Sequence, residues 1–483
     1  MSIRSAGLLL HPTSLPGPFG IGDIGPAADR FLDWAEAAGQ TLWQVLPLGP
    51  TGFGSSPYGA LSAFAGNSLL LSPERLVEDG LLSVSTIRDV PDFPEDRVEW
   101  DAVRNWKERL LRCAWSRSEK SSELRAGLDR FRNAPEQRSW LSDWALFAAR
   151  RSAGSTGGER ELAGEIAYQE FLQLLFSRQW ARLREEAARR GITLFGDVPI
   201  YVSPDGVDVS AHPELFALDA SGRALEVAGV PPDFFSTKGQ LWGYPLYRWD
   251  RMEEDGFGWW IERLRAAFLR TDVVRLDHFR GFVEYWAVPA ASVTAANGAW
   301  RPGPGRRLFD AVERALGPVA LVAEDLGTIT PDVRALLADL GLPGMKVLQF
   351  AFFEADSPYL PHNHVVTSVV YTGTHDNDTA RGWWGGLTGE EQQRVHDYLG
   401  SDGREIEWDL IRAAYASVAE RAIVPLQDVF GLGSEARMNT PGVGAGNWSW
   451  RARAQDFRSD RAARLARLAG LTGRTGRPLN GAR

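Results

Sequence analysis

Short apolar, β-branched runs recur along the chain, and most of them end in a polar or Gly/Pro-rich stretch. We count eight such runs, at residues 7–11, 41–48, 191–202, 272–279, 320–326, 344–352, 368–376 and 422–430. Amphipathic helical patterns lie between several of them, for example at 27–39 and 258–270. Near-continuous apolar strands that alternate with amphipathic helices indicate a parallel sheet in an α/β fold. Eight such units predict a (β/α)8 TIM barrel.

The spacing of the runs is uneven, which predicts where the barrel carries insertions. We expect a single catalytic domain over residues 1–470. Residues 80–190 show helical periodicity, and we interpret them as a helical insertion after the second strand. Residues 203–257 are aromatic and lack clear periodicity, which predicts a loop-like lid after the third strand. The polar, Gly/Arg-rich residues 471–483 predict a flexible tail.

Composition and charge narrow the class of partner. The net charge of −9 argues against a nucleic-acid partner, because nucleic-acid-binding domains usually show a basic surface. Cys113 is the only cysteine, so no intramolecular disulfide is possible. The first residues hold an apolar run too short for a signal peptide, and no segment approaches the ~20 apolar residues that span a bilayer. We therefore expect a cytoplasmic protein without a membrane partner.

Polar residues follow the predicted strands at the positions where barrel chemistry takes place. In the run TDVVRLDHFRG, Arg275 and Asp277 lie two residues apart and so point to the same side of a strand. A charge pair inside a sheet is costly unless it is paired or functional. Because barrel active sites lie at the C-terminal ends of the strands, we expect these charges to line the rim of a shared pocket. The other polar residues at predicted strand ends are Asp197, Glu324, Asp325, His375, Asp376 and Asp428.

Several carboxylates in one pocket fit the chemistry of glycoside bonds. That reaction needs a carboxylate nucleophile and a protonatable acid, which sit ~5–5.5 Å apart in a retaining mechanism. Asp277, beside Arg275, has the environment that keeps a nucleophile ionised. Glu324, beside Asp325 at the end of an apolar strand, has an environment that raises the pKa of an acid.

Other interpretations of these residues stay open. An Asp at a strand end is usually a helix cap or a turn residue, and Arg275 with Asp277 alone would fit a structural ion pair. A metal site is another interpretation of Asp and His clusters, but the seven histidines are scattered, with no pair at ligand spacing on one helix. The sequence has no G-x-S-x-G elbow, no Walker loop and no G-x-G-x-x-G between a strand and a helix. We therefore predict neither a metal nor a cofactor.

Eight motifs in one order carry a family resemblance that extends from residue 7 to about residue 451. The motifs occupy residues 11–25, 43–67, 196–202, 229–249, 275–281, 323–327, 373–379 and 437–451. On these motifs the sequence resembles the 4-α-glucanotransferases called amylomaltases or disproportionating enzymes, which are relatives of the α-amylases in one retaining clan. The resemblance implies a barrel without the separate C-terminal β-domain of α-amylases.

The resemblance also implies a role for individual residues. Asp277 in RLDHFRG would be the nucleophile, Glu324 in AEDLG the general acid/base, and Asp376 in GTHDNDT a ligand of sugar hydroxyls that stabilises the transition state. The residues implied to bind the sugar are Arg275, His375, Asp197, Tyr58 as the ring on which the donor glucose stacks, and Trp242 in the lid near the acceptor. Two positions depart from the family pattern, because Phe53 stands where relatives often have Tyr and Tyr244 replaces a common Asn.

We therefore predict a retaining 4-α-glucanotransferase, a hexosyltransferase of carbohydrate metabolism. It would move a segment of an α-1,4-glucan through a covalent glycosyl-enzyme to the 4-OH of an acceptor. The predicted partners are maltooligosaccharides, amylose or starch-like glucans, and glucose as acceptor. One alternative is an α-1,4-glucan hydrolase of the same clan, with water as acceptor. The other is a catalytically silent glucan-binding protein, which would lack some of the acids that this sequence has.

Overall fold

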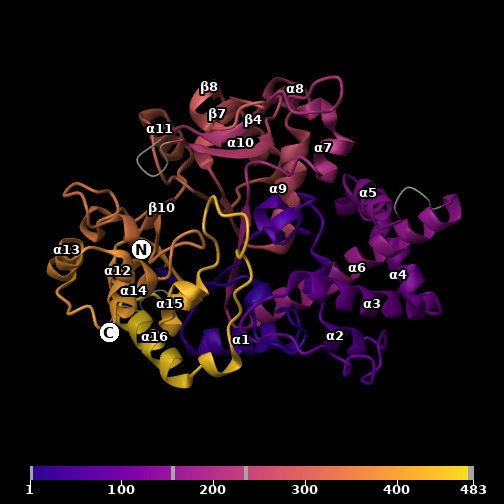
Figure 1. Ribbon diagram of the computed structural model, residues 1–483, viewed down its shortest axis with the longest axis horizontal. Helices are drawn as coiled ribbons and strands as arrows, with labels where there is room; N and C mark the ends of the chain where they lie inside the picture. Colours follow the sequence, from indigo (N-terminus) through magenta and orange to yellow (C-terminus); the bar gives the residue numbers. More distant parts are fainter. Residues whose placement is uncertain (1–3, 154–157, 233–237, 477–483) are drawn as a thin grey trace.

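Eight parallel strands form the centre of the molecule, and the predicted (β/α)8 barrel is confirmed (Figure 1). The computed structural model describes residues 4–153, 158–232 and 238–476. The strands are hydrogen-bonded in the order β10-β11-β12-β1-β2-β3-β6-β9. The backbone N–H of Ala323 donates to the carbonyl of Pro343 at 2.9 Å, which joins the two end strands and nearly closes the barrel. The bounds are Ser5–Leu9 (β1), Leu42–Gln44 (β2), Thr193–Val198 (β3), Val273–Leu276 (β6), Leu321–Ala323 (β9), Gly344–Val347 (β10), Ser368–Tyr371 (β11) and Arg421–Pro425 (β12).

Each predicted apolar run overlaps one of these strands, and most of the strands are shorter than the runs. The reason is visible in β3 and β6, where regular pairing stops at Val198 and Leu276. Beyond these residues the chain turns outward into the loops that carry the polar side chains. The runs continue past the strands because the first residues of these loops are also apolar and buried, as Ile200 and Phe279 are.

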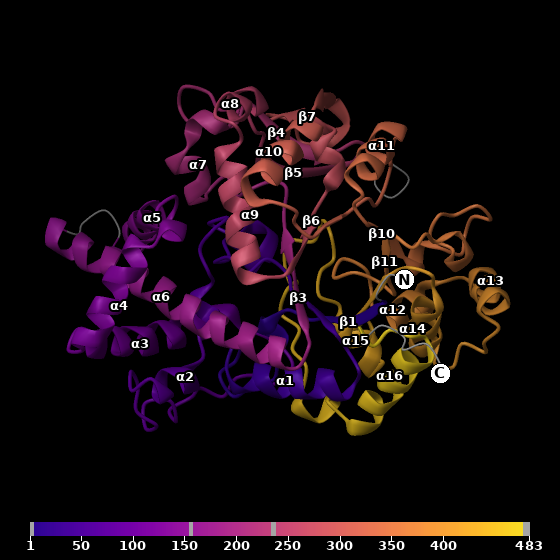
Figure 2. The ribbon, with the colours of Figure 1, turned by 180° about the vertical axis from the view of Figure 1, so that it is seen from behind.

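Helices surround the barrel and cover the outer faces of its strands (Figures 1 and 2). Their apolar stripes pack on the sheet, as for Phe31 and Leu32 of α1. Among the described residues, no helix has both the length and the apolar character needed to cross a membrane. The helices after the strands are Pro26–Ala37 (α1), Gly258–Arg270 (α9), Arg306–Leu316 (α10), Pro331–Leu340 (α11), Ala380–Gly386 (α12), Gly389–Leu399 (α13), Ile406–Ala416 (α14), Leu426–Phe430 (α15) and Ser459–Leu471 (α16).

Helices fill the part of the chain interpreted as an insertion after the second strand. They lie at one end of the molecule, and helix α6 reaches from them back to the barrel (Figure 2). The buried ammonium of Lys107 donates to the carbonyls of Leu69 and Leu71 at 2.7 and 2.8 Å, which ties α3 to the loop after β2. The helices are Pro73–Glu78 (α2), Trp100–Ser118 (α3), Ser122–Asn133 (α4), Leu141–Ala153 (α5) and Glu159–Arg189 (α6).

The segment 203–257 is not the loop that the sequence predicted. It holds two strands, which join two later strands in a four-stranded antiparallel sheet of order β5-β4-β7-β8. The pairing with β7 and β8 is non-local, so no local period in the sequence reveals it. Residues 233–237 lie outside the described residues. The elements are Val207–Ala211 (α7), Glu226–Val230 (β4), Gln240–Pro245 (β5), Trp249–Glu254 (α8), Glu284–Pro289 (β7) and Ala299–Pro302 (β8).

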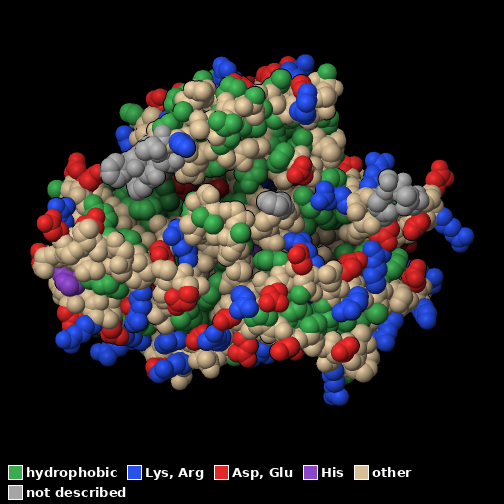
Figure 3. Space-filling model, in the orientation of Figure 1, with side chains coloured by type: hydrophobic (Ala, Val, Ile, Leu, Met, Phe, Trp, Pro, Cys, Tyr) green, Lys and Arg blue, Asp and Glu red, His purple; other side chains and the backbone are tan. Residues whose placement is uncertain are grey.

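The surface shows no broad patch of one charge on the face seen in Figure 3, where basic and acidic side chains are interspersed. A recess on this face separates the part that carries β7 and β8 from the barrel below it (Figure 3).

Arg474, in the stretch from residue 471 that was predicted to be flexible, is instead part of the packed structure. Arg474 is fully buried and its guanidinium donates to backbone carbonyls at the base of the barrel. Two of these carbonyls, of Ala414 and Tyr415, belong to the last turn of α14, where helical partners are missing. The others belong to Ser5, Ser417, Ala419 and Glu420. Residues 477–483 lie outside the described residues.

We expect Arg474→Met to destabilise the fold strongly, because methionine fills the space but removes the donor that these buried carbonyls share. A loss of about 3 kcal/mol in the free energy of unfolding is expected from such unsatisfied groups. The measurement is the midpoint of urea-induced unfolding. Arg467→Met, at an exposed position of α16, is the matched control and should leave the midpoint unchanged. Equal midpoints for the two variants would contradict a structural role of Arg474.

Candidate active site

A buried guanidinium joins the carboxylates of two neighbouring strands. Asp197 of β3 and Arg275 of β6 are direct partners in the strand register. Arg275 Nη1 donates to both carboxylate oxygens of Asp197 at 2.8 and 2.7 Å, and its Nη2 lies 2.7 Å from Oδ1 of Asp277. Burial alone would lower the pKa of Arg275, but the carboxylates of Asp197 and Asp277 raise it well above its usual value. Arg275 is therefore a permanent cation between two acids.

Asp277 stands directly after β6 and is the more open of the two acids that contact Arg275. Its side chain is 27% exposed, whereas the side chain of Asp197 is fully buried. The Asp277 carboxylate thus has one oxygen fixed by the guanidinium and remains partly accessible to solvent. This arrangement suits a nucleophile, while Asp197 is placed to support Arg275 from behind.

Glu324 follows β9 and has a different environment from Asp277. Its Oε2 accepts a hydrogen bond from the backbone N–H of His278 at 2.7 Å, and its Oε1 accepts one from that of Leu326 at 2.9 Å. Among the described residues it forms no ion pair. Burial, with a smaller contribution from the negative charge of Asp277, raises the pKa of Glu324 to about 8. The carboxyl group therefore carries a proton at neutral pH and can donate it.

Asp325 has a structural function rather than a place in this cluster. Its Oδ1 accepts a hydrogen bond from the backbone N–H of Met345 at 2.6 Å, which ties the end of β9 to β10. The charge of Asp325 is only a minor cause of the raised pKa of Glu324.

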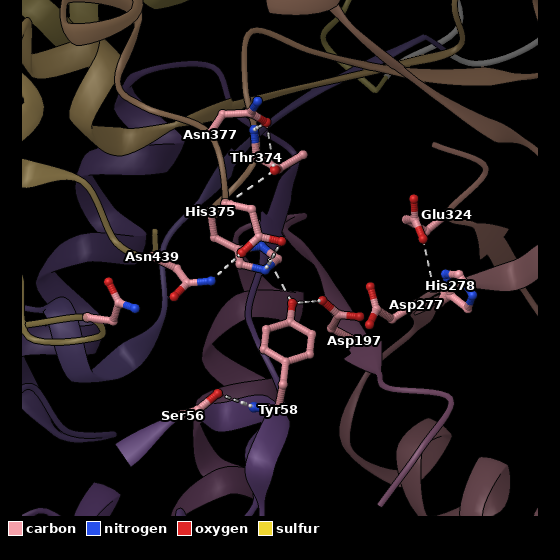
Figure 4. Close-up of polar contacts among 12 residues, drawn as sticks. Ser56, Tyr58, Asp197, Asp277, His278, Glu324, Thr374, His375, Asn377 and Asn439 are labelled. Atoms are coloured by element: carbon pink, nitrogen blue, oxygen red, sulfur yellow. Dashed lines mark hydrogen bonds and ion pairs between the residues drawn. The ribbon is translucent and has the colours of Figure 1, made fainter. Parts of the chain in front are cut away.

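An aromatic wall closes the side of the cluster formed by the loop after β2. The hydroxyl of Tyr58 donates to Oδ2 of Asp197 at 2.6 Å, and its ring stacks on His375 with centroids 4.9 Å apart (Figure 4). Trp448 packs on both rings, with centroids 5.8 Å from Tyr58 and 5.9 Å from His375. Burial and the charge of Asp197 raise the pKa of Tyr58 well above its usual value, so the hydroxyl remains a donor.

Asp376 is held by two residues from a later loop, to which the sequence analysis assigned no role. Asn439 Nδ2 donates to Oδ1 of Asp376 at 2.6 Å, and Arg437 donates to its backbone carbonyl at 2.6 Å. His375 Nε2 lies 3.3 Å from the other carboxylate oxygen of Asp376. Arg437, Asn439 and Trp448 belong to the motif at 437–451, which was the only sequence signal that this loop belongs to the site.

Trp242 of β5 brings the antiparallel sheet to the edge of the cluster. Its ring meets that of His278 edge-on, with centroids 4.8 Å apart. His278 has a left-handed backbone conformation, with φ 50° and ψ 54°, which is uncommon for a residue other than glycine. This turn directs the N–H of His278 toward Glu324 while the ring contacts Trp242. Burial lowers the pKa of His278 to about 4, so the ring is neutral at neutral pH.

The structure thus brings together all eight residues that the sequence predicted for the site, from six segments of the chain. Figure 4 shows Tyr58, Asp197, Asp277, Glu324 and His375 around one space. Among the described residues, no group of three or more His, Cys, Asp or Glu side chains is arranged to hold a metal ion. The side chain of Phe53, one of the departures from the family pattern, lies outside the described residues.

The sequence is similar to those of several 4-alpha-glucanotransferases. It is 47% identical to a 4-alpha-glucanotransferase of Synechocystis sp. over 472 residues, which is 93% of this chain and 94% of the relative. It is 47% identical to a 4-alpha-glucanotransferase of Thermus thermophilus over 480 residues, with the same coverage. A chloroplastic/amyloplastic 4-alpha-glucanotransferase of Solanum tuberosum is 48% identical over 93% of this chain and 82% of its own length.

The fold is similar to that of a solved amylomaltase. The amylomaltase of Streptococcus agalactiae in complex with acarbose superposes with a TM-score of 0.92 at 36% sequence identity, covering 98% of this chain and 99% of that one. The family described as 4-alpha-glucanotransferase matches residues 10–158 and 149–456, two overlapping stretches that span most of the sequence. On both grounds, the chain belongs to the 4-alpha-glucanotransferase family.

Proposed function

We propose that this 4-α-glucanotransferase works with Asp277 as the nucleophile and Glu324 as the general acid/base. Asp277 would attack the anomeric carbon of the donor glucan while Glu324 protonates the oxygen of the leaving chain. The acceptor 4-OH would then give its proton to Glu324 and take the glucosyl unit from Asp277. The observation that carries these roles is the contrast between the two environments. Arg275 contacts Asp277 at 2.7 Å, whereas burial keeps Glu324 protonated to about pH 8.

The other predicted residues would hold the donor sugar in place. Asp376, fixed by Asn439 at 2.6 Å, would accept hydrogen bonds from sugar hydroxyls, and these bonds would strengthen in the transition state. Tyr58 and His375 form a stacked wall against which the donor glucose would lie. Asp197 would act only through Arg275 and Tyr58. Acarbose, which the streptococcal neighbour binds, is expected to occupy this site.

Trp242 would form part of the acceptor side and help to keep water away from the glycosyl-enzyme. Its ring meets that of His278 edge-on. His278 directly follows Asp277 in the sequence and donates its backbone N–H to Glu324. Sugar rings stack on exposed indole faces, and a filled acceptor site leaves less room for water. We also propose a cytoplasmic location, which the single cysteine Cys113 supports.

The activity is tested by the products that form from maltotriose alone. We expect glucose together with a ladder of longer maltooligosaccharides, because each cleaved segment is passed to another sugar. Chromatographic separation by chain length, without added metal or cofactor, is the measurement. Glucose and maltose without longer products would instead indicate the hydrolase of the same clan, and an unchanged substrate would indicate a protein that only binds glucan.

Asp277→Asn should abolish transfer while the protein stays folded. The amide is nearly isosteric but cannot form the glycosyl ester, so kcat should fall on the order of 10⁴-fold. The measurement is glucose release from maltotriose alongside the unfolding midpoint. Asp205→Asn, at an exposed position in the loop after β3, is the matched control and should keep full activity. An Asp277→Asn enzyme with near-normal turnover would remove Asp277 from the mechanism.

The pH dependence of kcat/KM should report the proton on Glu324. The first step needs the protonated acid, and the pKa of Glu324 is raised to about 8, so activity should fall as the pH rises through that value. Well above this pH the decline should be about tenfold for each further pH unit. The alkaline limb should be absent from the residual activity of Glu324→Gln. A limb that persists unchanged in Glu324→Gln would assign the proton to another group.

A further inference from the structure

One buried carboxylate outside the candidate site joins the two ends of the segment that carries His375 and Asp376. Asp428 lies in α15, directly after β12, and is only 1% exposed. Its Oδ2 accepts a hydrogen bond from the hydroxyl of Thr372 at 2.6 Å, and its Oδ1 accepts one from the backbone N–H of Ala380 at 2.7 Å. Thr372 is the first residue after β11, and Ala380 is the first residue of α12. The side chain of Asp428 therefore binds the residues that flank the segment 373–379 on both sides.

The segment depends on such anchors because it is irregular and incompletely packed. A small cavity of about 20 Å³ lies against it, lined among others by His11, Thr374, His375 and Asp428. His11 Nδ1 is buried beside this cavity without a hydrogen-bond partner among the described residues. The segment has no regular secondary structure, so hydrogen bonds to its ends help to define its position.

Asp428 suits this anchoring function chemically. Burial raises its pKa to about 6, which leaves it ionised at neutral pH and able to accept both bonds. Bonds to a charged acceptor are roughly twice as strong as neutral ones. Among the described residues it has no ion-pair partner, so its charge is stabilised by Thr372 and Ala380 rather than by a cation. A buried, ionised carboxylate without such hydrogen-bond donors would be strongly destabilising.

We propose that Asp428 is a positioning residue for glucan transfer. By fastening Thr372 to Ala380 it holds His375 and Asp376 against the donor sugar, although it contacts neither of them through a hydrogen bond. The inference rests on the proposed function, because it requires Asp376 to bind the sugar in the transition state. A shift of about 1 Å in a positioned group can cost on the order of a hundredfold in rate. The loss should therefore appear in kcat more than in KM.

A pair of variants at Thr372 tests the anchor without changing Asp428. Thr372→Val is isosteric and removes the hydroxyl, whereas Thr372→Ser keeps it. We expect Thr372→Val to lower kcat for maltotriose by about tenfold, which is the effect of one hydrogen bond to a charged group, and Thr372→Ser to stay within about twofold. Asp428→Asn should retain more activity than Asp428→Ala, because the amide oxygen accepts from Ala380 and the amide nitrogen can donate to Thr372.

A second variant removes the other hydrogen bond to Asp428, so that the test does not depend on whether Thr372→Val folds. Ala380→Pro removes the N–H that donates to Asp428 and places the proline ring against its carboxylate, at the first helical position, where the backbone conformation of proline is tolerated. Thr379 already has an extended backbone, with φ −57° and ψ 156°, which suits a residue before proline. We expect a loss of kcat at least as large as that of Thr372→Val, with unfolding midpoints recorded for every variant.

A double-mutant cycle separates positioning from a general loss of structure. Calorimetry with acarbose should show about tenfold weaker binding for Thr372→Val, but no further weakening when Thr372→Val is added to Asp376→Asn. Equal behaviour of the Val and Ser variants, or additive losses in the cycle, would overturn the inference and leave the proposed function intact. Normal acarbose binding by Asp376→Asn would instead overturn the proposed role of Asp376, and the inference with it.

Discussion

The buried ion pair between Arg275 and Asp197 is the interaction on which both the barrel and its chemistry depend. The two residues are register partners on neighbouring strands, so a slip of one position would point the guanidinium away from Asp197. Removing one member of a buried pair leaves an uncompensated charge, which typically costs about 3–5 kcal/mol. The same contact that fixes the strand register therefore fixes the orientation of the guanidinium that reaches Asp277 at 2.7 Å.

The same guanidinium explains how two nearby carboxyl groups, of Asp277 and Glu324, come to have different environments. The cluster contains three acids, Asp197, Asp277 and Glu324, but only one permanent cation. Arg275 contacts the first two and leaves Glu324 in a buried position with two backbone donors. Those donors favour the ionised form, yet burial and the charge of Asp277 outweigh them. Glu324, which lacks an ion pair, therefore keeps its proton, and it is the acid proposed to donate it.

The sequence was informative about the barrel residues because parallel strands direct their C-terminal ends to one face. Once eight runs were recognised, the polar residues after each run had to converge, and Asp277, Glu324 and His375 do so. The individual roles came from the motifs, since spacing alone does not distinguish a nucleophile from a turn residue. Arg437, Asn439 and Trp448 were missed because an irregular loop after β12 brings them to Asp376 and Tyr58 by contacts with no period.

The other differences between the prediction and the structure also arise from contacts between residues that are distant in the sequence. The strands β4 and β5 pair with each other, and β4 also pairs with β7, which is more than 50 residues further along than the start of β4, so local patterns suggested a loop. Arg474 lies in a polar, glycine-rich stretch that is typical of a frayed end. It is nevertheless buried, because six backbone carbonyls, from the end of α14, the turn after it and β1, all accept hydrogen bonds from its guanidinium. No property of the tail itself reveals that these acceptors exist.

The antiparallel sheet gives a physical reason why this site can favour a sugar over water as acceptor. Trp242 contacts His278, next to the proposed nucleophile Asp277, and the hydroxyl of Tyr244 on the same strand lies 3.5 Å from the carbonyl of Tyr58 on the proposed donor side. With these roles, one strand would border both sides of the bond that is cleaved. An acceptor glucan bound beside this strand would exclude water as it brings its own hydroxyl to Glu324, so that binding the acceptor would both supply the second substrate and suppress hydrolysis.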